Sequence, residues 1–474
     1  MTARSAIGKD IASGGALAIA AAVRAGQASA VQIAEAALAR IEADDPALNS
    51  FTTVTAERAL AEARAVDARR AQGYDPGPLA GVPYAVKNLF DIAGITTVAG
   101  SKIDAERPPA AADATAVRRL AEAGAVLVGA LNMDEYAYGF TTENTHYGPA
   151  RNPHDRDRIA GGSSGGSGNA VAGGLVPLSL GSDTNGSIRV PASLCGIFGL
   201  KPTYGRLGRG GARPFVASLD HVGPLARSAA DLAAAYDAMQ GPDPHDPACA
   251  GRPVEPALPQ LARGVDRLRI AVAGGHFAGA GEAAEAVATV AQALGVATRT
   301  IEVPEAARAR AAAFIITASE GGNLHLSDLR TRAADFDSMT RDRFLAGTMV
   351  PAAWVIQAQR FRGWFRERVL ELFREVDVLL APATPCPAPR IGQETIEIDG
   401  VEVPMRPYLG VYTQPLSFIG LPIVAVPVHL PGKLPIGVQV IAAPWREADG
   451  LRIAAALERD GVVTAPVPGN GTAA

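Results

Sequence analysis

Short apolar runs alternate with helical stretches along most of the chain. The runs typical of buried strands lie at residues 79–91, 125–131, 175–181, 268–273, 376–381, 422–428 and 436–441. Helical patterns lie at residues 115–124, 228–240, 281–295, 359–374 and 446–459, and two alanine-rich helices fill residues 16–45, ending near Asp45-Pro46. This alternation predicts an α/β fold with a largely parallel or mixed sheet.

Two stretches lack these patterns. Residues 241–264 are rich in proline and predict a long connection, and residues 465–474 predict a flexible C-terminal tail. The chain shows no internal repeat, and the strands on both sides of the proline-rich connection have the same apolar character. We therefore expect one domain over residues 1–464.

Composition narrows the classes of function. Of the 474 residues 48% are apolar, and the net charge of −4 gives no basic surface for nucleic acid. No run of 18 apolar residues predicts a membrane span, and the alanine-rich N-terminus is typical of a helix, not of a signal peptide. Cys195, Cys249 and Cys386 are far apart and lack zinc spacing, so we expect no disulfide framework and a reducing, cytoplasmic setting.

The most unusual stretch is residues 158–206, where two loops of small residues, GGSSGGSG and SDTNGS, flank a short helical and strand-like segment. Glycine lets backbone amides approach a substrate closely. A developing oxyanion needs several N–H donors aimed at one point, and the turn Thr184-Asn185-Gly186-Ser187 can supply them. The pattern indicates a catalytic serine.

Other interpretations of this stretch fit less well. A flexible linker would not be embedded between apolar runs. No Gly-Lys-Ser/Thr follows, which excludes a Walker A loop, and Val171 stands where a dinucleotide fingerprint needs its third glycine. The letters of residues 161–165 also match a G-x-S-x-G elbow, which would make Ser163 the nucleophile and require a histidine. The histidines that follow lie in settings typical of structural or exposed residues: His221, His245, His276, His325 and His429.

A serine without a histidine needs another base, and lysine serves when burial lowers its pKa towards neutrality. Lys87 is the best candidate because GVPYAVKNLFD surrounds it with apolar residues. A lysine that reaches to solvent from a strand end is the alternative interpretation. Lys102 and Lys201 are rival bases.

These segments resemble the amidase signature family, through GGSSGGS, GSDTNGSIRVPAS and CGIFGLKPTYGR, and the likeness extends over nearly the whole chain with a core at about 80–230. The resemblance implies a large mixed sheet between layers of helices and a Ser–Ser–Lys catalytic set. Carried over by motif, Lys87 is the base, Ser163, held by a cis peptide, is the bridge, and Ser187 is the nucleophile. Residues 184–187 would form the oxyanion hole with backbone N–H groups. Asp183 and Arg189 match positions that brace the loop, whereas Asn185 departs from the Gly-Gly-Ser of many members.

The resemblance also bears on substrate and partners. SDTNGSIRVPASLCG and VQVIAAPW are most similar to members that hydrolyse small ureides to a urea carboxylate and ammonia, with a small accessory subunit. The alternatives are a general amidase, an inactive scaffold protein, and a subgroup that hydrolyses glutamine for a tRNA-dependent amidotransferase. That last subgroup places an aspartate where this chain has Gly410. We expect Tyr138, Thr142 and Asn144 to line the pocket, and we expect homodimerisation, no cofactor and no metal.

Overall fold

An 11-stranded mixed sheet runs through the protein, in a computed structural model that describes residues 13–469. Its strands lie in the order β1-β3-β2-β8-β10-β9-β16-β17-β13-β11-β12. Their bounds are β1 Phe51–Val54, β2 Pro83–Lys87, β3 Val126–Leu131, β8 Leu178–Asp183, β9 Phe198–Lys201, β10 His221–Ala226, β11 Ile270–Gly274, β12 Thr300–Glu302, β13 Val378–Pro382, β16 Ile423–Val428 and β17 Ile436–Ala442.

Parallel and antiparallel pairs alternate in blocks across this sheet. Strands β3, β2 and β8 are parallel neighbours, and β13, β11 and β12 form a second parallel group. Antiparallel pairs through β10, β9, β16 and β17 join the two groups. Because parallel strands end at the same edge of a sheet, the carboxyl ends of β3, β2 and β8 lie side by side.

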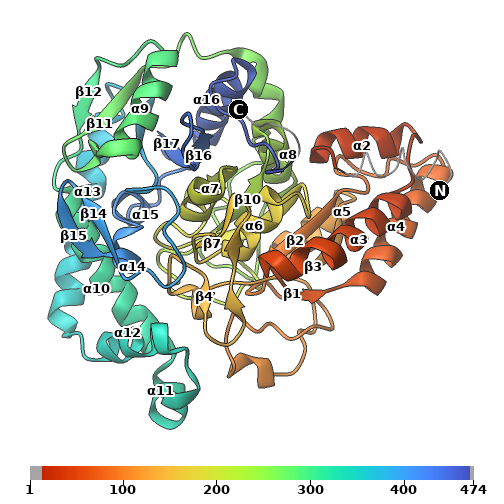
Figure 1. Ribbon diagram of the computed structural model, residues 1–474, viewed down its shortest axis with the longest axis horizontal. Helices are drawn as coiled ribbons and strands as arrows, with labels where there is room; N and C mark the ends of the chain where they lie inside the picture. Colours follow the sequence, from red (N-terminus) through yellow and green to blue (C-terminus); the bar gives the residue numbers. More distant parts are fainter. Residues whose placement is uncertain (1–12, 470–474) are drawn as a thin grey trace.

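Helices cover the sheet on both sides, as the α/β pattern predicts (Figure 1). One connected group consists of α2, α5, α8 and α16, and another contains α3, α4, α6 and α7. The bounds are α2 Ala16–Arg24, α3 Ala30–Leu48, α4 Ala56–Ala71, α5 Thr115–Glu122, α6 Gly165–Ala172, α7 Arg189–Cys195, α8 Ala229–Met239, α9 Gly281–Ala293 and α16 Glu447–Arg459.

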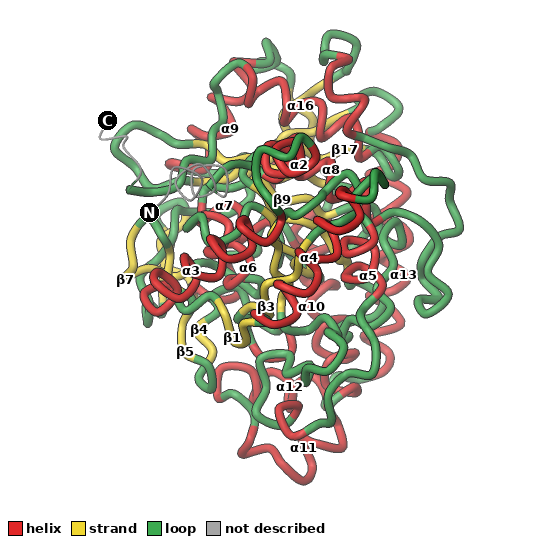
Figure 2. The backbone as a smooth tube through the Cα atoms, turned by 90° about the vertical axis from the view of Figure 1, so that its right-hand side faces the viewer, coloured by secondary structure: helices red, strands yellow, loops and turns green. Residues whose placement is uncertain are grey.

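A helical excursion separates β12 from β13. It comprises α10 Ala306–Leu324, α11 Leu326–Arg332, α12 Ser338–Thr348 and α13 Ala352–Leu372, and α10 packs against both α12 and α13. In Figures 1 and 2 α11 and α12 extend away from the sheet. The remaining elements are the short helices α14 Met405–Tyr408 and α15 Gln414–Ser417 and the ribbons β4 Glu143–Asn144 with β5 Gly148–Pro149, β6 Arg151–Asn152 with β7 Asp155–Ile159, and β14 Thr395–Ile398 with β15 Val401–Pro404.

The predicted fold class is confirmed, and the differences from the sequence-based prediction lie mainly in short or uniform elements. Strand β9 and the edge strands β1 and β12 have three or four residues each, which is too short for a pattern to be visible. Helix α3 continues through Pro46 to Leu48, because Asn49 adopts a left-handed conformation and closes the last turn by donating to Asp45 O.

The two stretches without a pattern are irregular in the structure. The proline-rich connection at 241–264 contains only a 3₁₀ helix, Leu258–Arg263. The predicted tail at 465–474 lies partly outside the described residues, and residues 465–469 form no helix or strand. No helix between residues 13 and 469 combines the length and apolar character that crossing a membrane requires.

Candidate active site

Three parallel strands deliver the polar residues of the site to one edge of the sheet. Lys87 is the last residue of β2, and Asp183 is the last residue of β8. Asp134 follows the end of β3 by three residues. The loop after β8 carries Ser187, and the loop before α6 carries Ser163. The sheet topology thus gathers residues from distant parts of the sequence.

Lys87 lies at the centre of a buried serine cluster. Its Nζ is 2.7 Å from Ser163 Oγ and 2.9 Å from Ser182 Oγ, and the lysine itself is fully buried. The peptide bond between Gly162 and Ser163 is cis. When Lys87 is neutral, its Nζ can donate to Ser182 and accept the proton of Ser163, which is the arrangement a general base requires.

The electrostatic setting favours the neutral form of Lys87 near neutral pH. Burial lowers the pKa of Lys87 to about 7, against the charges of Asp134, Asp220 and Asp183, which raise it. Burial also raises the pKa of Asp134 to about 6. Lys87 is therefore partly neutral under physiological conditions, whereas an exposed lysine is almost wholly protonated.

This pKa predicts the pH dependence of catalysis. A catalytic base works only without its proton, so with Lys87 in this role we expect kcat/KM to rise as pH increases through about 7 and to level off above it. The measurement is kcat/KM for ammonia release between pH 5 and 10. A profile that is flat over this range, or that falls as pH rises through 7, would contradict a lysine base.

The loop of residues 184–187 presents free backbone donors. Among the described residues none of these four N–H groups donates a hydrogen bond to another protein atom. The Ser187 carbonyl accepts from Ser164 N, and the Asn185 carbonyl accepts from Thr413 Oγ1, so the loop is fixed through its oxygens. Gly186 has φ +143°, and a Cβ there would lie 2.2 Å from Thr413 Oγ1. The sequence needs glycine here to form this turn.

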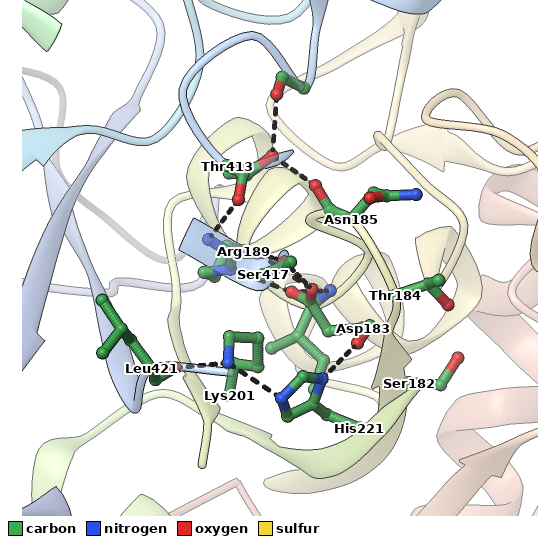
Figure 3. A network of polar contacts seen from close by, with 12 residues as sticks. Ser182, Asp183, Thr184, Asn185, Arg189, Lys201, His221, Thr413, Ser417 and Leu421 are labelled. Atoms are coloured by element: carbon green, nitrogen blue, oxygen red, sulfur yellow. Dashed lines mark hydrogen bonds and ion pairs between the residues drawn. The ribbon is translucent and has the colours of Figure 1, made fainter. Parts of the chain in front are cut away.

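A buried ion pair supports the loop from below. Arg189 Nε and Nη2 each donate to a carboxylate oxygen of Asp183 at 2.9 Å, and Asp183 Oδ2 also accepts from Ile188 N (Figure 3). Burial alone would raise the pKa of Asp183, but the charge and hydrogen bonds of Arg189 outweigh it and hold that pKa well below its usual value. Asp183 and Arg189 thus bridge the start and end of the loop of residues 184–187, which we call the serine loop.

The rival bases lie in other environments. Lys102 is exposed and pairs with Asp335 at 2.7 Å. Lys201 is buried, and its Nζ contacts Leu421 O, Pro202 O and His221 Nε2 (Figure 3). Within residues 13–469 no hydrogen bond joins Ser163 or Ser187 to a histidine. The geometry therefore favours Lys87 over either rival.

A small, narrow cavity opens beside Ser187. Its walls come from the serine loop, the segment after β3, the connection between β9 and β10, the helices α10 and α12, and α15: Ala137, Tyr138, Gly139, Phe140, Thr184, Asn185, Ser187, Phe215, Phe314, Thr317, Arg343 and Gln414. Within the described residues no group of His, Cys, Asp and Glu side chains is arranged to hold a metal ion.

The three residues expected to line the pocket lie in different places. Tyr138 is on the cavity wall, packed against Phe215 and Phe344. Thr142 is not on the wall; its hydroxyl accepts from Gly165 N and donates to Ser163 O, contacts that hold Ser163 in place. Asn144 is not on the wall either, and its amide is saturated by backbone groups of the neighbouring turns.

Sequence reasoning missed four residues of the site. Ser182 is the second partner of Lys87, and its place in the SDTNGS loop was a signal that could have found it. Thr317, Arg343 and Gln414 reach the cavity from the helical excursion and α15. Nothing in the local sequence marks these three, because only the tertiary fold brings them to the serine loop.

Comparison with known proteins identifies a family and several relatives of this chain. The amidase family matches residues 32–451. The chain is 59% identical to AtzE, which belongs to the 1-carboxybiuret hydrolase of Pseudomonas sp. (strain ADP), over 93% of this chain and 97% of that protein. It is 41% identical to one of the subunits of the glutamyl-tRNA(Gln) amidotransferase of Azotobacter vinelandii, over 90% of this chain and 93% of the relative.

Solved structures give the same result. A structure described as a vestigial protein complex that reveals the evolutionary origins of an s-triazine catabolic enzyme superposes with a TM-score of 0.94 at 57% identity, covering 96% of this chain and all of the other. A bacterial aryl acylamidase of the amidase signature family superposes with a TM-score of 0.87 at 28% identity, covering 95% of this chain and 96% of the other. This chain belongs to the amidase family, whose members hydrolyse C–N bonds.

Proposed function

We propose that the protein hydrolyses a terminal amide of a small ureide acid, with Ser187 as nucleophile and Lys87 as base. Neutral Lys87 takes the proton of Ser163, which takes that of Ser187. The Ser187 Oγ then attacks the carbonyl carbon, and the N–H groups of residues 184–187 stabilise the oxyanion. The 2.7 Å contact between Lys87 Nζ and Ser163 Oγ supports this order of proton transfer.

The same relay of Ser163 and Lys87 then completes the reaction by moving the proton in the opposite direction. The C–N bond breaks as the relay returns a proton to the leaving nitrogen, and ammonia departs. The product of this step is an ester of Ser187. A water molecule, deprotonated through Ser163 and Lys87, attacks that ester and releases a carboxylate and the free serine.

The observation that carries the substrate proposal is the composition of the cavity wall. The wall holds one cation, Arg343, and two primary amides, Asn185 and Gln414, and it contains no aspartate or glutamate. Arg343 is half-buried, donates from Nη1 to Tyr138 O at 2.8 Å, and lies over the Tyr138 ring at 3.7 Å from its centroid. Among the described residues no carboxylate lies within ion-pairing distance of it. A substrate carboxylate is the missing partner.

Glutamine fits this wall poorly. Its α-ammonium would need an acidic partner in the cavity, and the wall has none. A Cβ at Gly410 would lie 2.4 Å from Phe140 Cζ, so the Phe140 ring occupies the space that a side chain at position 410 would need. A ureide such as 1-carboxybiuret, on which the 59% identical relative acts by name, shares the terminal amide and a distal carboxylate with glutamine but carries no ammonium group.

A substrate comparison tests this proposal. We expect the highest kcat/KM for ammonia release from 1-carboxybiuret, less from biuret, and least from glutamine and simple aliphatic amides. Arg343→Gln should raise the KM for 1-carboxybiuret by about 10- to 100-fold, because a charge-assisted hydrogen bond is lost, and should change biuret kinetics far less. Arg341→Gln, on the same helix but exposed and paired with Asp342, is the matched control. Preference for glutamine would overturn the substrate assignment.

A fluorophosphonate probe separates an enzyme from an inactive scaffold. We propose that the probe labels the wild-type chain and that Ser187→Ala abolishes the label. Labelling that persists in Ser187→Ala, or that shifts to Ser163 only, would contradict the assigned nucleophile.

We also propose that the chain works with a small accessory subunit in a reducing compartment. The 57% identical structure, described as a vestigial protein complex, supports a partner. The free thiols of Cys195, Cys249 and Cys386 fit a cytoplasmic location. Homodimerisation stays a prediction, which the mass of the protein in solution tests.

A further inference from the structure

The side chain of Asn185 has an unpaired hydrogen-bond acceptor. Asn185 is only 6% exposed, and its Nδ2 donates to Thr317 Oγ1 at 2.9 Å. Its Oδ1 is buried and has no hydrogen-bond donor among the described residues. A buried amide oxygen without a partner is costly, and native proteins leave few of them. A function in binding explains this unpaired acceptor.

The position of Asn185 shows which part of a substrate it meets. It lies two residues before Ser187, and both residues line the same cavity. Figure 3 shows its side-chain amide pointing away from Asp183 and Arg189, the pair that braces the loop. The hydrogen bond to Thr317 of α10 fixes the amide on the cavity side.

The two sides of the scissile bond face different groups. The leaving nitrogen must receive its proton from Ser163 and Lys87, and neither of these residues lines the cavity. The acyl part of the substrate, which stays attached to Ser187 after ammonia leaves, therefore occupies the cavity. The group next to the scissile carbonyl on this side is the one nearest to Asn185.

We infer that Asn185 is a specificity-determining residue, whose Oδ1 accepts a hydrogen bond from an N–H group bonded to the scissile carbonyl on its acyl side. This inference rests on the proposed ureide hydrolysis and adds the group that selects ureides. An ordinary carboxamide has a carbon atom at that position, so Oδ1 of Asn185 stays unpaired when such a substrate is bound. Thr317 acts as a positioning residue, because its hydroxyl holds the amide in the orientation that presents Oδ1.

Biuret and malonamide form the pair of substrates that tests this contact. They differ only in NH against CH₂ between the two carbonyl groups, and both lack the distal carboxylate, so Arg343 does not enter the comparison. The wild type should prefer biuret by about 10- to 100-fold in kcat/KM, the range expected when a site built for a hydrogen bond meets an analogue without it. Asn185→Leu, which keeps the number and branching of the side-chain heavy atoms but removes the polar amide, should bring the ratio close to 1.

A second variant separates this contact from a general disturbance of the loop. Thr317→Val removes the hydroxyl that orients the amide while keeping its shape, and should lower the same ratio by a smaller factor. Thermal unfolding and fluorophosphonate labelling of Ser187 report whether each variant keeps a folded, reactive loop. If Asn185→Leu is no longer labelled, the ratio of kcat/KM for biuret to that for malonamide in Thr317→Val decides whether Asn185 makes this contact.

The outcomes distinguish this inference from the function on which it rests. If the wild type hydrolyses ureides but shows no preference for NH over CH₂, or if the preference survives in both variants, the role of Asn185 is wrong and the proposed function stands. If the wild type releases ammonia from no ureide, both are wrong.

Discussion

Lys87→Ala is expected to lower kcat/KM by about 10⁴-fold, because it removes the proposed base of both the acylation and the deacylation steps. The lysine is fully buried, with Ser163 and Ser182 as its partners, so no solvent-exposed group can replace it. The measurement is ammonia release under single-turnover and steady-state conditions. Folding is checked by thermal unfolding, because alanine leaves a cavity where the long side chain was.

Two control variants show whether the loss of activity comes from the missing basic nitrogen of Lys87. Lys87→Met fills the same space without a basic nitrogen and should be as inactive as Lys87→Ala but more stable. Lys102→Ala removes an exposed lysine paired with Asp335 and should leave turnover near that of the wild type. Activity within tenfold of wild type in Lys87→Met would eliminate the relay through Ser163.

The parts of the site that the sequence predicted are those on contiguous motifs. The SDTNGS and GGSSGGS loops identified Ser187 and Ser163 as candidates, and the apolar surroundings of Lys87 predicted the burial that the structure shows. The distance between Lys87 and Ser163 was not predictable from local pattern. It follows from the packing of α6, whose preceding loop carries Ser163, against β2 and β8, which only the tertiary fold establishes.

The substrate-facing wall was predicted less well, for a physical reason. Thr317 and Arg343 lie on α10 and α12, helices with charged and small residues distributed around them and no clear apolar face. Their contribution depends on how the excursion packs over the serine loop. Thr142 and Asn144 were placed in the pocket because they follow Tyr138 in sequence, but the chain turns there and directs them to backbone groups instead. Their part in substrate binding stays a prediction.

The fold class could be predicted from the sequence without knowing the conformation of individual loops. Buried strands such as β16, and β17 apart from Gln439, are apolar runs, which is typical of strands covered on both faces of a sheet. The short ribbon β14–β15 is largely exposed and carries no comparable signal. Sequence patterns therefore identified the centre of the protein more reliably than its periphery.

Arg189→Met is expected to destabilise the fold by about 3–5 kcal/mol, because it leaves the Asp183 carboxylate buried without its counterion. Arg189 is fully buried, and its five N–H groups meet acceptors on Asp183 (two), Ser417, Gln439 and Thr413. Loss of the arginine therefore removes the hydrogen bonds that connect the end of the serine loop to α15 and to β17. The measurement is the free energy of unfolding in urea, with kcat/KM at a temperature where the variant is folded.

A matched ion pair on the surface shows whether burial is the cause. Arg269 holds Asp377 through the same two-bond geometry, at 3.1 and 3.0 Å, but is about half exposed. Arg269→Met should change stability little, since water replaces the lost partner of Asp377. The double variant Asp183→Leu/Arg189→Met should be less destabilised than the sum of its single variants, because no unpaired charge remains. Equal effects at the two arginines would contradict a role for the buried pair in holding the serine loop.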